Sequence, residues 1–236
     1  EVNDKGLLVK IEPFPKEINT KTHESSATFS SDGSIMYFNR TNDKKVDVGN
    51  EKFASVKIFK AEFKDGKWEN IVALPFTSDS YSTEHPVLSK DGKKLYFSSD
   101  MPGTIGSFDI YFVDVNEDGT FGAPQNMGNT INTIHREQFP FISDDGKLLY
   151  FASDGHQGMG GLDIFMSKSY DGVFAKPLNL GETINSNMDD FGYIVDEKKN
   201  KGYLSSSRKG SDNLYSFTRT ENEARYVVEG EVKDKN

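Results

Sequence analysis

The sequence contains no cysteine, one tryptophan and only four histidines in 236 residues. Without cysteine the chain can form neither a disulfide framework nor a thiolate metal site, and it has no cysteine nucleophile. It also has no run of 18 consecutive apolar residues, the length that a membrane-spanning helix needs. The 28 Lys and Arg residues are outnumbered by 37 Asp and Glu, so the net charge is −9 and a nucleic-acid-binding surface is not expected. The chain begins at Glu1 rather than at a methionine, and we expect it to be a processed or excised part of a longer protein.

An internal repeat decides the predicted fold. Each unit opens with a short apolar stretch, passes through a turn that contains Asp-Gly in three of the four units, and continues into a second stretch with a central tyrosine. Asp-Gly is a strong hairpin signal because glycine accepts a positive φ without steric cost. The spacings between the aligned tyrosines are 59, 54 and 53 residues. These tyrosines are Tyr37, Tyr96, Tyr150 and Tyr203.

Each unit also contains a third and a fourth strand-like stretch. A Gly-rich loop leads into the third stretch, at 108–112 in the second unit and at 162–166 in the third. Four antiparallel strands repeated in tandem are typical of a β-propeller, in which radially stacked blades cover each other's faces. We therefore predict an all-β fold, a β-propeller of four-stranded antiparallel blades.

The N-terminal segment 7–19 predicts how the ring closes. The interval from Ile18 to Glu24 equals the interval from Ile184 to Asp190, so residues 7–19 match the outer strand of a blade. Because the fourth unit lacks its own outer strand, we expect the N-terminal strand to complete that blade and to close a ring of four blades. The alternative is a larger propeller in which residues 7–19 end a missing blade.

The domain boundary is predicted near residue 220, so that residues 7–220 form the propeller. Residues 221–225 are polar, and residues 226–234 form a strand-like run that ends in charge. We expect 221–236 to be a linker and the first strand of a following β domain. The alternative is that this run pairs with the fourth blade.

The repeat resembles the WD40-like propeller repeat of TolB-type proteins. The pattern Pro-x-x-Ser-x-Asp-Gly-Lys-x-Leu-Tyr-Phe occurs at 86–97 and again at 140–151. With Gly-Met-Gly-Gly-Leu-Asp-Ile-Phe at 158–165 and Pro-Leu-Asn-Leu-Gly-x-x-Ile-Asn at 177–185, the chain resembles more specifically the propeller of OmpA-family cell-envelope proteins of Bacteroidetes.

This second resemblance implies a setting for the chain. A tetratricopeptide region would precede the propeller, and a carboxypeptidase-regulatory-like domain, which Val228-Glu229-Gly230-Glu231-Val232 fits, would follow it before a peptidoglycan-binding OmpA-like domain. The implied protein is periplasmic, outer-membrane-associated and tied to type IX secretion and gliding motility. The propeller would be a non-catalytic protein-protein interaction scaffold with a protein partner in the cell envelope. It would reach peptidoglycan only through the other domains, without nucleic acid and without entering a membrane itself.

Four acidic residues recur near the starts of the units, where the first strand of a blade lines the central channel. They are Glu24, Glu84, Glu137 and Asp190. Three share one register, whereas Glu84 is shifted by one residue because Thr83 takes the equivalent position. Clustered carboxylates suit cations or a basic peptide, so an acidic, partner-binding mouth is one interpretation. The other is that these acids cap strand ends or bind backbone amides.

Long loops are further candidates for partner contact. The insertion at 40–53 exceeds its equivalents in the other units, and Gly-rich loops occur at 101–107 and 155–161. The alternative is that these are solvated loops without a partner. The candidate residues are Lys44, Lys45, His156 and Met159.

No motif predicts catalysis, a metal or a cofactor. The sequence has no Gly-x-Ser-x-Gly elbow, no His-Glu-x-x-His pair and no Asp-x-Asp-x-Asp-Gly loop. Asp109 and Asp163 recur one unit apart, as a structural position does, rather than as an acid/base pair. We therefore expect a protein that is not an enzyme. The alternative is the substrate-gating propeller of a prolyl-oligopeptidase-like peptidase, or a glycosidase propeller.

Overall fold

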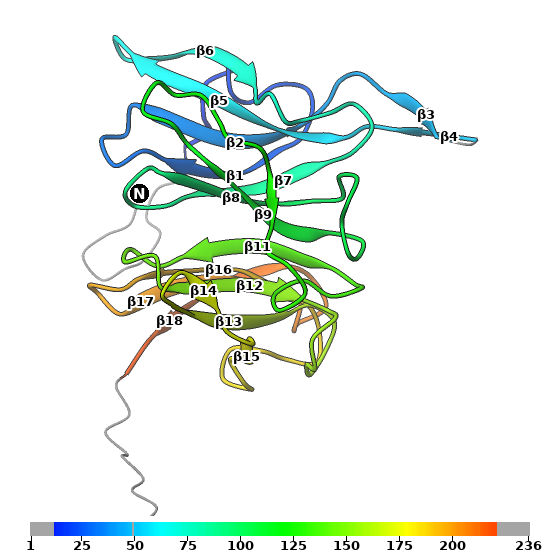
Figure 1. Cartoon of the computed structure of the whole chain (residues 1–236), viewed down its shortest axis with the longest axis vertical. Coiled ribbons are helices and arrows are strands. Elements are labelled where there is room, and N and C mark those ends of the chain that lie inside the picture. The colour runs from blue at the N-terminus through cyan, green and yellow to red at the C-terminus, as the bar shows by residue number, and fades with distance from the viewer. Residues whose placement is uncertain (1–11, 49, 221–236) are drawn as a thin grey trace, which may run out of the picture.

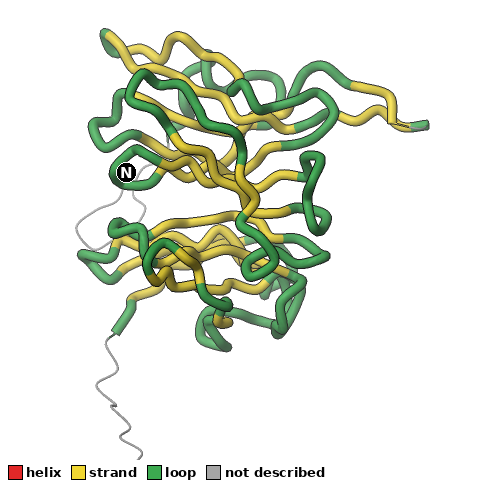
Figure 2. Tube along the Cα trace, viewed as in Figure 1, coloured by secondary structure: helices red, strands yellow, loops and turns green. Residues whose placement is uncertain are grey.

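The computed structural model describes residues 12–48 and 50–220. Every regular element in these ranges is a β-strand (Figure 2), so the described part of the chain has no helix that could cross a membrane. The strands form four antiparallel sheets in chain order, arranged as the four blades of a propeller (Figure 1). The predicted all-β propeller architecture is confirmed.

Blades 1 and 2 have four strands each. Blade 1 consists of β1 (Glu24–Phe29), β2 (Ile35–Thr41), β5 (Val56–Lys64) and β6 (Lys67–Ala73). Blade 2 consists of β7 (Thr83–Leu88), β8 (Lys94–Ser99), β9 (Asp109–Asp114) and β10 (Gln125–Asn126). The insertion in blade 1 forms a separate hairpin of β3 (Val46–Val48) and β4 (Glu51–Phe53) that projects from the body of the molecule (Figure 1).

Blade 3 divides its outer strand in two, and blade 4 has three strands. Blade 3 consists of β11 (Glu137–Ile142), β12 (Leu148–Ser153) and β13 (Asp163–Tyr170), with β14 (Val173–Phe174) and β15 (Leu178–Asn179) both paired to β13. Blade 4 consists of β16 (Asp190–Asp196), β17 (Lys201–Ser206) and β18 (Asn213–Thr218).

The turn between the first two strands explains the repeated Ser-x-Asp-Gly pattern. In blade 2 the Ser89 hydroxyl donates to the Asp91 carboxylate at 2.6 Å, and Asp91 accepts the N–H of Lys93 at 3.1 Å. Gly92 follows at φ +73°, a conformation that a side chain would disfavour. Equivalent Ser–Asp hydrogen bonds form in blades 1 and 3, so each hairpin is specified by its own sequence.

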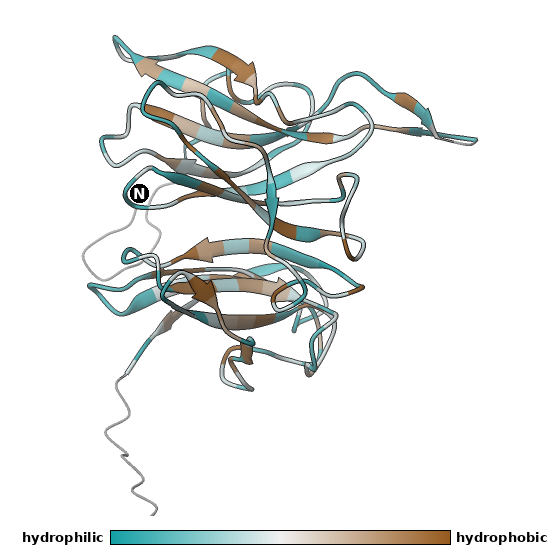
Figure 3. Cartoon of the chain, viewed as in Figure 1, coloured by the Kyte–Doolittle hydropathy of each residue, from teal (hydrophilic) through white to brown (hydrophobic). Residues whose placement is uncertain are grey.

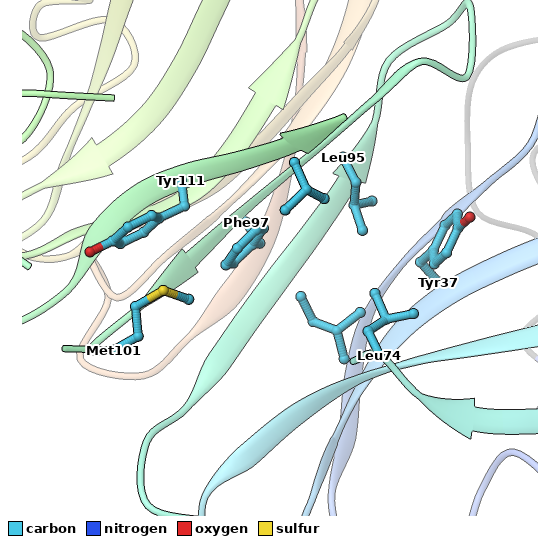
Figure 4. Close-up of a cluster of buried hydrophobic side chains, with 8 residues drawn as sticks. Tyr37, Leu74, Leu95, Phe97, Met101 and Tyr111 are labelled. Carbon is cyan, nitrogen blue, oxygen red and sulfur yellow. The ribbon is translucent and has the colours of Figure 1, made fainter. Parts of the chain in front are cut away.

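The hydrophobic core lies between blades. Tyr37 of blade 1 packs with Leu95 and Phe97 of blade 2 (Figure 4). Tyr96 and Tyr150 occupy the same position at the next two interfaces. Apolar residues are therefore concentrated in the strands, whereas most loops are hydrophilic (Figure 3). Each blade is stabilised by burying its faces against its neighbours.

The predicted closure by an N-terminal strand is not found among the described residues. Residues 12–23 form no strand, and residues 7–11 and 221–236 lie outside the described residues. The N–H groups of Ile18 and Asn19 donate to the carbonyl of Pro15, just as those of Ile184 and Asn185 donate to Gly181. The matching interval in the sequence therefore marks, in the described residues 15–19, the connection that enters a blade. That connection covers blade 1, because Ile18 is buried in a cluster with residues of β2 and β5.

Candidate functional site

All eight predicted site residues lie at one end of the blades, which we call the loop face. The first strands begin at this end, and the loops between second and third strands lie there too, because neighbouring strands are antiparallel. The two kinds of segment are hydrogen-bonded: the N–H of Ser107 donates to the carbonyl of His135 at 2.7 Å.

The three in-register acids bind the connection that precedes their own strand. Glu137 accepts the N–H of Thr133 at 2.7 Å and its hydroxyl at 2.8 Å. Asp190 accepts the N–H and hydroxyl of Ser186 at 2.5 and 2.8 Å. Glu24 binds Thr20 in the same way, so the alternative interpretation of these acids as caps describes the geometry.

Each of these carboxylates also has a partner on the second strand or beyond it. Arg40 donates to Glu24 at 2.9 Å, Ser153 to Glu137 at 2.6 Å, and Arg208 to Asp190 at 2.6 Å. Burial raises the pKa of Glu137, while the hydrogen bonds from Ser153 and Thr133 oppose the rise.

This geometry corrects the prediction for two of the acids. Glu137 and Asp190 are fully buried, so their carboxylates offer no surface to a partner. No group of three or more His, Asp or Glu residues in the described ranges is arranged to hold a metal ion. The predicted acidic mouth is therefore mainly a set of internal hydrogen bonds.

Glu84 is different because no side-chain hydrogen bond engages its carboxylate in the described part of the chain. Burial and the nearby charge of Asp100 raise its pKa to about 7. Its Oε2 lies 3.9 Å from Nε2 of His85, whose pKa burial lowers to about 3, so the imidazole is neutral. The His85 ring stacks on Phe139 of blade 3 at a centroid distance of 3.7 Å.

A β-bulge directs the His85 side chain into this position. His85 has φ +54° and Phe139 has φ +52°, and each lies at the register shift of its first strand. A bulge re-aims a side chain at the cost of local strain. The two bulges therefore join blades 2 and 3 through stacked rings near the channel.

The insertion of blade 1 is anchored by one carboxylate. Asp79 accepts hydrogen bonds from Lys44, from Lys57 at 2.5 Å and from Asn42 at 2.9 Å. These donors hold the pKa of Asp79 well below its ordinary value, and the same contact raises the pKa of Lys44. Lys44 and Lys45 are both exposed, and the Lys44 ammonium is paired at the base of the hairpin.

The two predicted residues of the 155–161 loop have different surroundings. His156 is half-buried between the rings of Phe151 and Phe165, and its Nε2 lies 2.7 Å from the carbonyl oxygen of Ile131. It supports the loop from within. Met159 is 46% exposed and is available for contact.

Three exposed apolar residues were missed in the sequence, and with Met159 they define a surface that we call the apolar rim. Ile134 is 75% exposed, and the rim consists of Ile105, Ile134, Met159 and Met188. Ile105 and Ile134 line one hollow of about 580 Å³. A signal was present in the sequence, because the immediate neighbours of Ile105, Ile134 and Met188 are polar residues or glycine.

Buried carboxylates and close glycine contacts fix the rim loops. Asp109 accepts the N–H groups of Ile105 and Gly106, and Asp163 accepts those of Met159 and Gly160 at 2.6 and 3.1 Å. A Cβ on Gly106 would lie 2.3 Å from the carbonyl oxygen of His135, so only glycine allows this approach. Both aspartates are fully buried and serve as structural supports.

Comparison with known proteins finds likeness at the level of structure. No protein-family model matches the chain, and no curated protein matches its sequence. The chain is similar to a putative TolB from Agrobacterium tumefaciens, with a TM-score of 0.54 and 17% identity over 84% of this chain and 59% of that chain. The chain has the TolB-type β-propeller fold. The chain is also similar to an α-L-arabinofuranosidase from Lactobacillus brevis, with a TM-score of 0.53 and 13% identity over 80% of this chain and 69% of that chain.

The chain spans about 59% of the length of the TolB structure. Because a glycosidase shares the fold, the fold by itself does not select a function. The function has to be argued from the surface and the side chains of this chain.

Proposed function

We propose that this chain is a non-catalytic protein-protein interaction module that binds its partner through the apolar rim. The observation that carries the proposal is the exposure of four large apolar side chains at one end of the blades. Exposed apolar groups that gather on one face of a protein commonly mark an interaction site. Ile134, at 75% exposed, is the most exposed of the four.

The rigidity of the rim supports this proposal. Asp109 and Asp163 bind the backbone of two rim loops, and Gly106 and Gly160 seat these loops on the connections between blades. Side chains presented on a fixed backbone lose little conformational entropy when they bind. The rim is therefore suited to a partner with a defined complementary surface.

The state of the carboxylates favours an interaction module over an enzyme. A glycosidase needs two carboxyl groups facing one bond, and both must be reachable by the substrate. Asp109, Glu137, Asp163 and Asp190 are all fully buried. Their hydrogen bonds hold loops in place, which is a structural task.

The wider setting of this proposal comes from the sequence resemblance. The pattern at 177–185 resembles the propeller of peptidoglycan-tethered, outer-membrane-associated proteins of Bacteroidetes. We place the chain in the periplasm, in a protein that supports secretion or gliding motility. Its partner would be a protein of the cell envelope, and peptidoglycan would be bound by other domains.

Site-specific photo-crosslinking in cells tests the rim. A photoreactive residue at position 134 or 159 of the full-length protein should capture the same partner. The same group at position 72, an exposed site on β6 of blade 1, serves as control. Ile134→Asp should abolish capture from position 159, whereas Val72→Asp should not.

Two outcomes would contradict the proposal. One is equal capture from positions 72 and 134, which would show that the rim has no special role. The other is hydrolysis of an arabinofuranoside or a prolyl peptide by the purified chain, if Asp109→Asn abolishes it without unfolding the protein.

A further inference from the structure

A cleft of about 540 Å³ opens between blades 2 and 3 at the end of the blades opposite the loop face. The turns that follow β7 and β11 form its walls, and the end of β13 borders it. Tyr96 and Phe174 contribute aromatic surface, and Asp91, Asp114 and Asp144 contribute carboxylates. This cleft is separate from the apolar rim, so the inference does not rest on the proposed function.

The Tyr96 side chain is the unusual feature of the cleft. The residue is only 6% exposed and lines the cleft, and no group of the described residues hydrogen-bonds its hydroxyl there. Buried phenol groups ordinarily have such a partner. Burial and the negative charges of Asp91 and Asp114 raise the pKa of Tyr96 to about 12. A cationic donor at this point would satisfy the hydroxyl oxygen and attract the Asp91 carboxylate.

The repeat shows which group occupies the equivalent position one interface further on. Tyr150 is the equivalent of Tyr96, and it lies between blades 3 and 4. Burial raises the pKa of Tyr150, and the charge and hydrogen bond of Arg219 oppose that rise. Asp145 and Glu197 are the acidic neighbours there, at the positions that Asp91 and Asp144 hold in the cleft.

Backbone hydrogen bonds identify the residue of blade 3 that corresponds to Arg219. The N–H of Arg219 donates to the carbonyl of Asn200 at 2.7 Å, and the N–H of Ser169 donates to that of Lys147 at 2.7 Å. Ser169 therefore stands where Arg219 stands, and it lines the cleft. Its side chain is too short to reach the Tyr96 hydroxyl.

The interface between blades 1 and 2 fills the same space in another way. Val115 is the equivalent residue, and its N–H donates to the carbonyl of Lys93 at 2.8 Å. Val115 and Phe121 pack against the cluster that contains Tyr37. At the interface between blades 2 and 3, Phe174 is the equivalent of Phe121, and it packs against the cluster that contains Tyr96. Among the three interfaces in the described part of the chain, this one is distinguished by Ser169, which stands where the others have Val115 or Arg219.

We propose that the cleft between blades 2 and 3 binds the guanidinium group of an arginine side chain on a partner polypeptide. The guanidinium would donate to the Tyr96 hydroxyl and to Asp91 and Asp144, as a planar fork of donors can. Phe174 offers an aromatic face for stacking. The nearby cation Lys94 is paired with Asp114 at 2.7 Å and lies over Phe112. Lys90 and Lys93 also line the cleft, and Oδ1 of Asp91 accepts the Ser89 hydroxyl and the Lys93 N–H. The guanidinium would therefore bind the second carboxylate oxygen of Asp91, together with Asp144.

The first test is a titration of the isotope-labelled chain, followed by NMR. The probe is the peptide Gly-Gly-Arg-Gly-Gly, with citrulline and lysine versions as controls and free arginine amide as a second arm. We expect amide shifts confined to 89–94 and 143–147, and arginine binding about tenfold tighter than citrulline binding. Free arginine amide should bind the same site more weakly than the peptide. Equal binding of citrulline, or shifts spread over the surface, would overturn the proposal.

Variants at three positions test whether binding depends on an open cleft rather than on folding. Ser169→Arg should fill the cleft from within the chain and abolish peptide binding, whereas Ser169→Ala should bind like the parent. Tyr96→Phe keeps the ring and removes the hydroxyl, and it should weaken binding severalfold. Arg219→Ser should open a second site at Tyr150 and raise the stoichiometry from one peptide to two. Unchanged binding in folded Ser169→Arg, together with unchanged stoichiometry in Arg219→Ser, would refute the assignment.

Discussion

At the scale of single residues, the carboxylates of the loop face differ in how their charge is compensated. Glu24 and Asp190 have an arginine and hydroxyl donors, whereas Glu84 has neither within the described residues. Thr or Ser four positions before an in-register acid, as at Thr20 and Glu24, is a sequence signal for a cap. The spacing is visible in the sequence, but it acquires meaning only when the connection folds back over the strand.

Glu84 should make the stability of the chain depend on pH. Burial raises its pKa from 4.5 to about 7, so the folded state binds the proton more tightly than the unfolded state. The free energy of unfolding should therefore fall as pH rises from 4.5 to 7, by about 3 kcal/mol. Glu84→Gln removes this loss, so its advantage over the parent should grow between pH 5 and pH 8 in urea unfolding.

His85 has to be separated from this effect. Burial lowers its pKa to about 3, so its contribution to stability is lost as pH falls below 6.5, the opposite direction. The difference between Glu84→Gln and the parent cancels the His85 contribution because both proteins contain it. Exposed Glu117→Gln is the matched control. A difference that stays constant from pH 5 to pH 8 would show that Glu84 titrates normally.

At the scale of elements, the connection that enters each blade is the unit that repeats most faithfully. Asn132 binds both the N–H and the carbonyl of Ile110, and Asn185 binds Ile164 in the same way. Asn19 is the equivalent residue before blade 1, but it is exposed. Asn19 therefore serves as an internal control for the geometry that Asn132 and Asn185 share.

Removal of the buried asparagines should destabilise the chain. Asn132→Ala or Asn185→Ala leaves the buried N–H of Ile110 or Ile164 without its partner, which costs about 1–3 kcal/mol. The carbonyl of the same residue keeps the N–H of Met127 or Leu180. Asn19→Ala should cost almost nothing. Chemical denaturation of the three variants measures the difference, and equal losses in all three would contradict the role assigned to this contact.

The loop that contains Gly106 lies directly against the backbone of residues 133–135, and this close packing predicts a sensitive position. A Cβ at position 106 would lie 2.3 Å from a carbonyl oxygen, whereas at position 122 its nearest contact would be an ordinary 3.6 Å. Gly106→Ala should therefore lower the free energy of unfolding by about 1–3 kcal/mol, and Gly122→Ala should be close to neutral. A neutral Gly106→Ala would mean that the rim loop can move away without cost.

At the scale of the whole molecule, the sequence predicted the blades because each hairpin carries its own turn signal. Asp91 and Gly92 specify one such turn by local hydrogen bonding and backbone conformation. Closure depends on contacts between distant segments, and no local pattern encodes it. The apolar rim could not be predicted from the sequence for the same reason. Ile105 and Ile134 line one hollow only because two loops from successive blades are hydrogen-bonded to each other.

The stacking of blades predicts an order of local unfolding. Blades 2 and 3 are packed on both sides, whereas the outer face of blade 4 is uncovered in the described structure: Leu214 is 56% exposed, but its equivalents Ile110 and Ile164 are fully buried. In such a nearest-neighbour array the end unit opens first. Ile164→Ala should lower the free energy of unfolding by about 2–4 kcal/mol, and Leu214→Ala should lower it much less.

Hydrogen exchange in low urea should show β17 amides opening about 2 kcal/mol more easily than β12 amides. Equal protection of β12 and β17 would instead mean that all four blades unfold as one cooperative unit.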